Sequence, residues 1–295
     1  MKRTSCTRRD FFRKSAAAAG AVYLGRSVRS AAEEQKKSRV VLIRNRDVLD
    51  DLNRPDPDIL EYMLNEALGM LTEVSDPETA WKSLFKSSDV VGIKSNHWRH
   101  LRTPESLEQA IRRGVMRAGV PEDSIGVRDW GVRTDPLFQK ATALINVRPM
   151  RTHHWAGVGS LLKNYILFSE KPSAIHPDTC ADLASLWKLP ICNGKTRLNV
   201  LVMLTPLFHG VGPHHFSPEH TWPYKGLLLG FDPVAVDATG LRIIQGKRNA
   251  FFGEDRPLNP PAKHIRLADT RHGVGTADPA RIELIKLGMD EESYV

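Results

Sequence analysis

Basic and imidazole side chains follow two apolar segments of the chain, at 89–94 and 143–147. The residues concerned are Lys94, Asn96, His97, Arg151, Thr152 and His153. Ammonium, guanidinium and amide groups suit the fixation of a carboxylate or phosphate, and imidazoles suit proton transfer. We therefore expect a cationic pocket for a small anionic ligand, with His97 and His153 as its acid/base groups.

A pair of glycines extends the second segment. Gly157 and Gly159 precede a helix that we expect to begin near Ser160, where backbone N–H groups would meet an anion at the positive helix end. Lys163 would lie one turn into that helix, beside Asn164. We count Lys163 among the catalytic residues, and the glycines and Asn164 among the ligand-binding residues. The spacing also allows a packing turn that leaves Lys163 in solvent.

Two aspartates frame a later apolar segment. Asp232 precedes Pro233 and is predicted to cap a helix, since proline suits the first helical position. Asp237 lies in an apolar turn, where an unpaired carboxylate would be costly. We expect it to pair with a buried lysine, Lys94 or Lys163. Both aspartates are candidate ligand-binding residues.

Eleven histidines allow a metal site. The candidate ligands are His154, His214 and His215, because imidazole is a common ligand of transition metals. Pro218 prevents the segment after them from presenting its imidazoles on one helix face. Most of these histidines are expected to be loop residues or polar partners in the core, so the cofactor stays unknown.

The hydrophobic periodicity alternates between strands and helices. Strands are expected at 39–44, 89–94, 124–128, 143–147, 198–204 and 226–231, and helices at 58–74, 103–118, 136–141 and 232–244. Thr103 is the predicted N-cap of the second helix, and residues 269–295 are expected to form a helix and a short terminal element. Doubly buried strands between helices predict an α/β fold with a mixed, mostly parallel sheet covered on both faces. Ligands of such sheets bind beyond the carboxyl ends of the strands.

The N-terminus is typical of a twin-arginine export signal. Arg8 and Arg9 precede an apolar run from Ser15 to Gly25, which is well short of the roughly twenty residues of a spanning helix. We predict a leader at 1–32 and a single α/β domain at 33–295. The expected location is the periplasm, reached through the twin-arginine translocation machinery, without a permanent membrane anchor.

Charge and cysteine content narrow the class of protein further. Without the leader the chain has 34 Lys and Arg against 33 Asp and Glu, which gives no case for binding nucleic acid. Cys180 and Cys192 remain, and could form a disulfide or stay as buried thiols. Neither belongs to a C-x-x-C pair, so no iron–sulfur cluster is expected.

Four segments together resemble the family called domain of unknown function 362. They are I-K-S-N at 93–96, R-T-H at 151–153 with a later L-K-N at 162–164, G-V-G-P at 210–213 and D-P-V-A-V-D at 232–237. The resemblance extends from about Val40 to Leu287 and implies no established activity. The family usually has lysine where this chain has Arg151, a fixed guanidinium fork. Many relatives also carry a ferredoxin-like cysteine segment, whose absence here argues against electron transfer.

Three hypotheses follow from these residues. The first is an exported enzyme acting by acid/base, isomerase or oxidoreductase chemistry on a small carboxylate. The order of His153, the two glycines and Lys163 is also similar to the cofactor-binding half of lactate racemase, although the spacing differs. The second is a non-catalytic periplasmic protein that binds a metal or an anion. The third is a structural interaction domain, in which the polar strand ends would not meet.

Overall fold

The computed structural model describes residues 37–210 and 216–295, which form the predicted mixed α/β fold. The strands are β1 (Ser38–Arg44), β2 (Val91–Lys94), β3 (Ile125–Arg128), β4 (Ala143–His153), β5 (Gly157–Gly159), β6 (Thr196–Leu207), β7 (Gly226–Gly230) and β8 (Ile282–Gly288). The helices are α2 (Pro57–Thr72), α3 (Pro77–Leu84), α4 (Glu105–Arg117), α5 (Pro136–Lys140), α6 (Leu161–Asn164), α7 (Pro177–Cys180), α8 (Pro233–Phe252) and α9 (Lys263–Thr270).

One eight-stranded sheet joins all strands of the described residues, in the order β3-β2-β4-β6-β7-β1-β8, with β5 paired to β4. Strands β3, β2, β4, β6, β1 and β8 run in one direction, because only the pairings made by β5 and β7 are antiparallel. The sheet is therefore mostly parallel, as predicted, and the carboxyl ends of β2, β4 and β6 share one edge.

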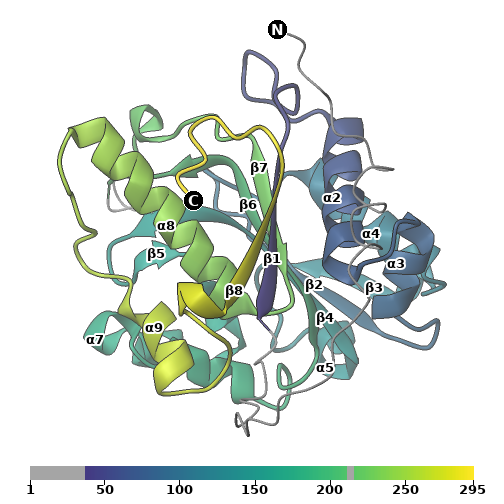
Figure 1. Cartoon of the computed structure of the whole chain (residues 1–295). Helices are drawn as coiled ribbons and strands as arrows, with labels where there is room; N and C mark the ends of the chain where they lie inside the picture. The colour runs from purple at the N-terminus through teal and green to yellow at the C-terminus, as the bar shows by residue number, and fades with distance from the viewer. Residues whose placement is uncertain (1–36, 211–215) are drawn as a thin grey trace, which may run out of the picture. The chain divides into compact units, whose positions relative to one another are not determined.

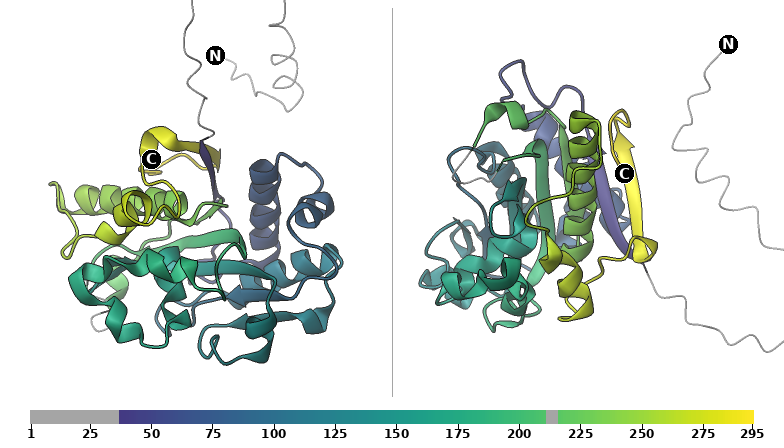
Figure 2. Two further views of the ribbon diagram at one scale, coloured as in Figure 1. Left: turned by 90° about the horizontal axis from the view of Figure 1, so that it is seen from below. Right: turned by 90° about the vertical axis from the view of Figure 1, so that its left-hand side faces the viewer.

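Helices cover both faces of the sheet (Figure 1, Figure 2). On one face, α2, α3 and α4 bury a core with Ile93, Ile145 and Val200 of the central strands. On the other face, α8 and α9 pack with α6 over residues such as Leu144 and Leu201. Successive side chains of a strand point to opposite faces, so each central strand contributes to both cores.

The helix starts follow the local sequence. Asp56 caps α2 by accepting hydrogen bonds from the backbone N–H groups of Asp58 and Ile59. Asp232 caps α8 in the same way, as predicted, and α8 continues to Phe252, beyond the expected end. The predicted N-cap of α4, Thr103, was wrong by one position. Pro104 is the N-cap, and no side chain accepts a hydrogen bond from the first turn of the helix.

Three further expectations needed correction. The segment after residue 269 contains strand β8, which is parallel to β1, where a helix was expected. Its residues are only partly buried or exposed, so its strand conformation depends on the pairing with β1. Strand β4 is six residues longer than the predicted 143–147, and its pairing with β6 shifts register between Pro149 and Arg151. Gly157–Gly159 returns as a strand against β4, where a loop before a helix was expected.

The described residues 37–210 and 216–295 belong to one compact unit. The twin-arginine motif and the leader boundary lie outside the described residues and stay predictions. Among the residues that are described, no helix is long and apolar enough to cross a bilayer. Cys180 and Cys192 are free, buried thiols, which decides between the two alternatives left open by their spacing.

Candidate functional site

The connections after β2 and β4 leave the sheet toward opposite faces. Strand β2 leads into α4, which packs with α2, whereas β4 leads through β5 into α6, which packs with α8. Such a divergence between neighbouring parallel strands is where open α/β sheets bind ligands. Here the Arg151 guanidinium crosses the divergence, since its Nη1 donates to Oδ1 of Asn96 at 2.9 Å.

Two arginines of β4 meet beside Gly159. A Cβ atom at Gly159 would lie 2.7 Å from Nη2 of Arg148 and 3.5 Å from Cγ of Arg151. The register shift after Pro149 interrupts the regular alternation of side chains, which lets residues three apart approach the same point. Glycine at 159 therefore leaves room for the guanidinium of Arg148 and the aliphatic part of Arg151, whereas we expected it to let the backbone approach an anion.

Arg148 is a buried cation without a partner. It is 4% exposed, and its guanidinium makes no hydrogen bond or ion pair with any residue that the structure describes. Burial lowers its pKa to about 10, partly opposed by the charges of Asp129 and Asp237. Buried charged groups are normally paired, so these donors are available to a ligand.

Arg151 is only partly satisfied. It is 5% exposed, and its guanidinium carbon lies 4.4 Å from the ring centre of Trp98. Its Nε and the hydroxyl of the adjacent Thr152 have no hydrogen-bond partner within the described part of the chain. Burial and the charge of Arg148 hold the pKa of Arg151 well below its usual value.

Lys163 completes the basic group. It is 3% exposed, and its ammonium donates a hydrogen bond to Sγ of Cys180 at 3.7 Å. Its pKa is lowered to about 8, mainly by burial and also by the charges of Arg148 and Arg151, while Cys180 opposes the shift. We refer to Arg148, Arg151 and Lys163 as the buried basic cluster.

His153 borders this cluster as a neutral donor. Its Nδ1 accepts a hydrogen bond from the backbone N–H of Trp155 at 3.1 Å, which leaves the ring proton on Nε2. Burial depresses the pKa of His153 strongly, and Lys163, Arg148 and Arg151 add to the effect. His153 thus suits hydrogen-bond donation to an anion better than the expected acid/base role.

A second histidine near Lys163 and Arg148 was not identified from the sequence. His264 of α9 is fully buried, and burial together with the charges of Lys163 and Arg148 lowers its pKa to about 3. Both histidines therefore stay neutral at ordinary pH. The basic charge of the site comes from the arginines and the lysine.

Lys94 and Asn164 belong to a neighbouring polar network. The Lys94 ammonium donates to Asp129 at 2.9 Å, to the Ser95 carbonyl at 2.6 Å and to Oδ1 of Asn164 at 3.2 Å. The Asn164 amide donates to Asn146, among others, at 2.8 Å. All three protons of Lys94 are used, so this predicted ligand-binding pair fixes β2 to α6.

His97 lies apart from His153, with which it makes no recorded contact among the described residues. Its Nε2 is 2.8 Å from Oε1 of Glu108 on α4, and its backbone N–H donates to Asp129 at 2.8 Å. One third of its side chain is exposed. The predicted His97–His153 pair is therefore not assembled, although Asp129 joins His97 to the network of Lys94.

Asp237, a residue of α8, has its carboxylate at the N-terminus of α6, where we expected an external anion. Its carboxylate accepts hydrogen bonds from the Ser160 hydroxyl at 2.6 Å and from the backbone N–H groups of Leu161 and Leu162, each at 2.9 Å. Burial raises its pKa to about 6 against the effect of these bonds. The expected lysine partner was wrong, because backbone amides and a hydroxyl already satisfy the carboxylate.

Two other predicted ligand residues serve packing. Asp232 follows β7, which is antiparallel to β6, so it lies at the opposite edge of the sheet. Besides capping α8, its carboxylate accepts from the Ser38 hydroxyl at 2.7 Å. Gly157 has φ of +72°, and a Cβ there would lie 2.6 Å from the backbone nitrogen of Ala262. It lets the loop before α9 approach β5.

The metal hypothesis gains no support. No group of three His, Cys, Asp or Glu side chains in the described part of the chain could hold a metal ion. The ring of His154 stacks on His153 with ring centres at 4.7 Å, and it contacts Trp155 at a tilted angle with ring centres at 4.2 Å. His214 and His215 lie outside the described residues.

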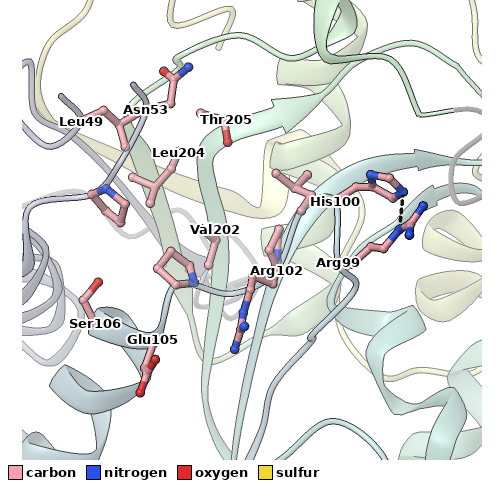
Figure 3. Close-up of a pocket in the computed structure, with 14 residues that line it drawn as sticks. Leu49, Asn53, Arg99, His100, Arg102, Glu105, Ser106, Val202, Leu204 and Thr205 are labelled. Carbon is pink, nitrogen blue, oxygen red and sulfur yellow. Dashed lines mark hydrogen bonds between the residues drawn. The ribbon is translucent and has the colours of Figure 1, made fainter. Parts of the chain in front are cut away.

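An open pocket lies near the same sheet edge, beside β4 and β6 (Figure 3). It has a volume of about 400 Å³ and an apolar floor that includes Pro149, Val202 and Leu204. At its rim, Nε of Arg99 donates to the His100 ring at 2.9 Å. The buried basic cluster does not line this pocket. The Trp98 ring links the two, as it contacts both His100 and Arg151.

Sequence reasoning missed Arg148, Asp129, Cys180 and His264. The available signal for Arg148 was a charged residue directly after an apolar strand and three positions before Arg151. We took the strand to end at Val147, so this arginine was not assigned to the buried part of β4. Cys180 and His264 are far from β4 in the sequence and are placed by tertiary packing alone.

Comparison with known proteins gives one family match. No curated protein and no solved structure matches the chain significantly. The match begins after α4 and covers the elements from β3 to β7 and the first half of α8. It includes Arg148, Arg151, Lys163 and Asp237. The model of the family named Domain of unknown function (DUF362) matches residues 120–242 of this chain.

Proposed function

We propose that this protein is exported to the periplasm and binds a small anionic ligand, a carboxylate or a phosphate, in the buried basic cluster. The observation that carries the proposal is the buried guanidinium of Arg148, which has no partner among the described residues. A buried arginine without a counter-ion destabilises the empty protein, and a bound anion removes that penalty. Arg151 supports the proposal, since its Nε is also without a partner.

Within this site the residues have distinct roles. Arg148 and Arg151 fix the anion through planar, multidentate hydrogen bonds. His153 donates from Nε2. Lys163 is the group suited to proton transfer, because its pKa of about 8 lies near ordinary working pH. If the protein is an enzyme, Lys163 is its acid/base residue.

The alternative is a protein that binds the anion without converting it. The closure of the site favours this alternative, since Arg148, Arg151 and Lys163 are each at most 5% exposed. The two functions differ in what remains bound. A binding protein retains its ligand unchanged, whereas an enzyme releases a product after exchange with solvent.

Native mass spectrometry of the mature protein, isolated from the periplasm of its own source, tests ligand binding. We expect the folded protein to carry one small anion that is lost from the Arg148→Met variant. Elemental analysis of the same sample measures phosphorus and metals. A wild-type protein that is empty, and stays empty with millimolar phosphate and carboxylates, would contradict the proposal.

Export is tested separately. Replacement of Arg8 and Arg9 by lysines should retain the uncleaved protein in the cytoplasm, measured by cell fractionation and the mass of the N-terminal peptide. Cleavage is expected near Ala32. Normal export of the double variant would remove the twin-arginine route from the proposal while leaving the ligand site untouched.

A further inference from the structure

The buried charges beside Arg148 do not balance. The charge of Arg148 acts on three other buried basic side chains, namely Lys94, Arg151 and Lys163. Each is at most 5% exposed, so solvent screens these charges poorly.

Among the described residues, two carboxylates offset part of this positive charge. Asp129 forms an ion pair with Lys94 at 2.9 Å, and Asp237 accepts its three hydrogen bonds from Ser160, Leu161 and Leu162. Both act on Arg148 only from a distance, because neither makes an ion pair with it. Two positive charges remain without compensation.

The neighbouring groups do not alter this count. His153 and His264 are neutral because burial lowers their pKa. Burial raises the pKa of the Cys180 thiol, which therefore stays protonated beside Lys163. Glu108 contacts Ser95 and His97, and its carboxylate is not among the charges that act on the four basic side chains.

We infer that the ligand of the buried basic cluster is a compact dianion. The inference rests on the proposed function and adds the charge of the ligand. Two negative charges balance the two uncompensated positive charges, whereas a monoanion leaves one of them uncompensated. A compact ligand follows from Gly159, beside which the guanidinium of Arg148 and the side chain of Arg151 converge. Phosphate, a phosphate monoester and a short dicarboxylate share this chemistry.

The test compares anions of similar size and shape that carry different charges. Sulfate and methanesulfonate are both small and tetrahedral, and carry two charges and one. Isothermal titration of the mature protein at pH 7 should show sulfate binding tighter by at least about tenfold, as expected for a second charge in a poorly screened site. The same titration is then carried out with inorganic phosphate and with malonate. Tighter phosphate indicates a phosphoryl ligand, and tighter malonate a dicarboxylate.

Variants test whether the preference for sulfate over methanesulfonate arises at the buried basic cluster. Arg148→Met removes one uncompensated charge and should reduce the preference for sulfate to about threefold or less. Arg266→Met is the matched control, because this arginine is exposed on α9, and it should retain the wild-type preference. Should Arg148→Met fail to fold, Gly159→Ala displaces the same guanidinium and is expected to weaken sulfate binding.

The outcomes separate the inference from the proposed function. Equal affinity of wild-type protein for sulfate and methanesulfonate overturns the dianion and leaves an anion site. An unchanged preference in Arg148→Met and Gly159→Ala overturns the assignment to this cluster. Failure of every anion to bind overturns both proposals.

Discussion

Replacement of Arg148 by methionine should stabilise the empty protein. Methionine keeps most of the buried volume and removes a charge that has no partner among the described residues. Burial lowers the pKa of Arg148 from 12.5 to about 10. At 1.36 kcal/mol for each pKa unit, this shift corresponds to roughly 3 kcal/mol of penalty on the charged form. The free energy of unfolding should rise by up to that amount.

Urea denaturation followed by circular dichroism measures the change. The buffer should contain no phosphate, sulfate or carboxylate, because a bound anion would stabilise the wild type and hide the effect. In a thermal melt, the same gain corresponds to a rise of about 5 to 10 °C for a domain of this size. A given concentration of anion should then stabilise the wild type more than the variant.

Arg248 provides a matched control. It is equally buried, but its guanidinium donates to the backbone carbonyls of Arg256, Phe208 and Pro257 at 2.9 to 3.1 Å. Arg248→Met leaves these carbonyls without donors and should cost about 2 to 4 kcal/mol. A loss of stability in Arg148→Met similar to that in Arg248→Met would refute the reasoning, because it would show that Arg148 is already satisfied in the empty protein.

Three further predictions concern neighbouring residues. Gly159→Ala should weaken anion binding with little change in stability, because the added Cβ meets the movable end of Arg148. Gly157→Ala should lower the free energy of unfolding by about 1 to 3 kcal/mol, because its φ is +72° and the added Cβ meets backbone. Equal melting temperatures for the two variants would contradict this. Asp237→Asn should cost about 2 to 4 kcal/mol in denaturant titration, because a charged acceptor of three hydrogen bonds is lost, and a neutral effect would remove its role at α6. The pKa of Lys163 falls from 10.5 to about 8 on folding, so the unfolded chain binds more protons between these values and stability should rise with pH there. Lys163→Met should flatten that rise by about 1.4 kcal/mol per pH unit, and an unchanged slope would show that this lysine does not titrate.

The fold was predictable where local pattern and burial agree. Strand β2 and helix α2 have continuous or periodic apolar residues, and the structure places both within a few residues of the prediction. Strand β8 could not be found in this way, because its seven residues alternate between partial and full exposure and gain their place from pairing with β1. The direction of β7 was equally hidden, since apolar residues carry no information on strand polarity.

The site was predictable in its chemistry and not in its partners. Arg151, His153 and Lys163 were identified because basic residues follow apolar strands, and the structure brings these three together. Lys94 belongs to a satisfied network, and Asp237 binds backbone amides, because the short α6 lies between them. Such choices among donors depend on distances of an ångström or less, which residue spacing along the chain does not determine.

The position of a bound dianion tests the central claim most directly. Selenate is a tetrahedral dianion whose selenium scatters anomalously, so diffraction from crystals of the mature protein soaked in selenate locates it without bias. We predict one selenium peak within hydrogen-bonding reach of the guanidinium of Arg148 and of Nε of Arg151, absent from crystals of Arg148→Met. Selenate bound only elsewhere, or equally in the variant, would contradict the claim that these arginines are reserved for a ligand.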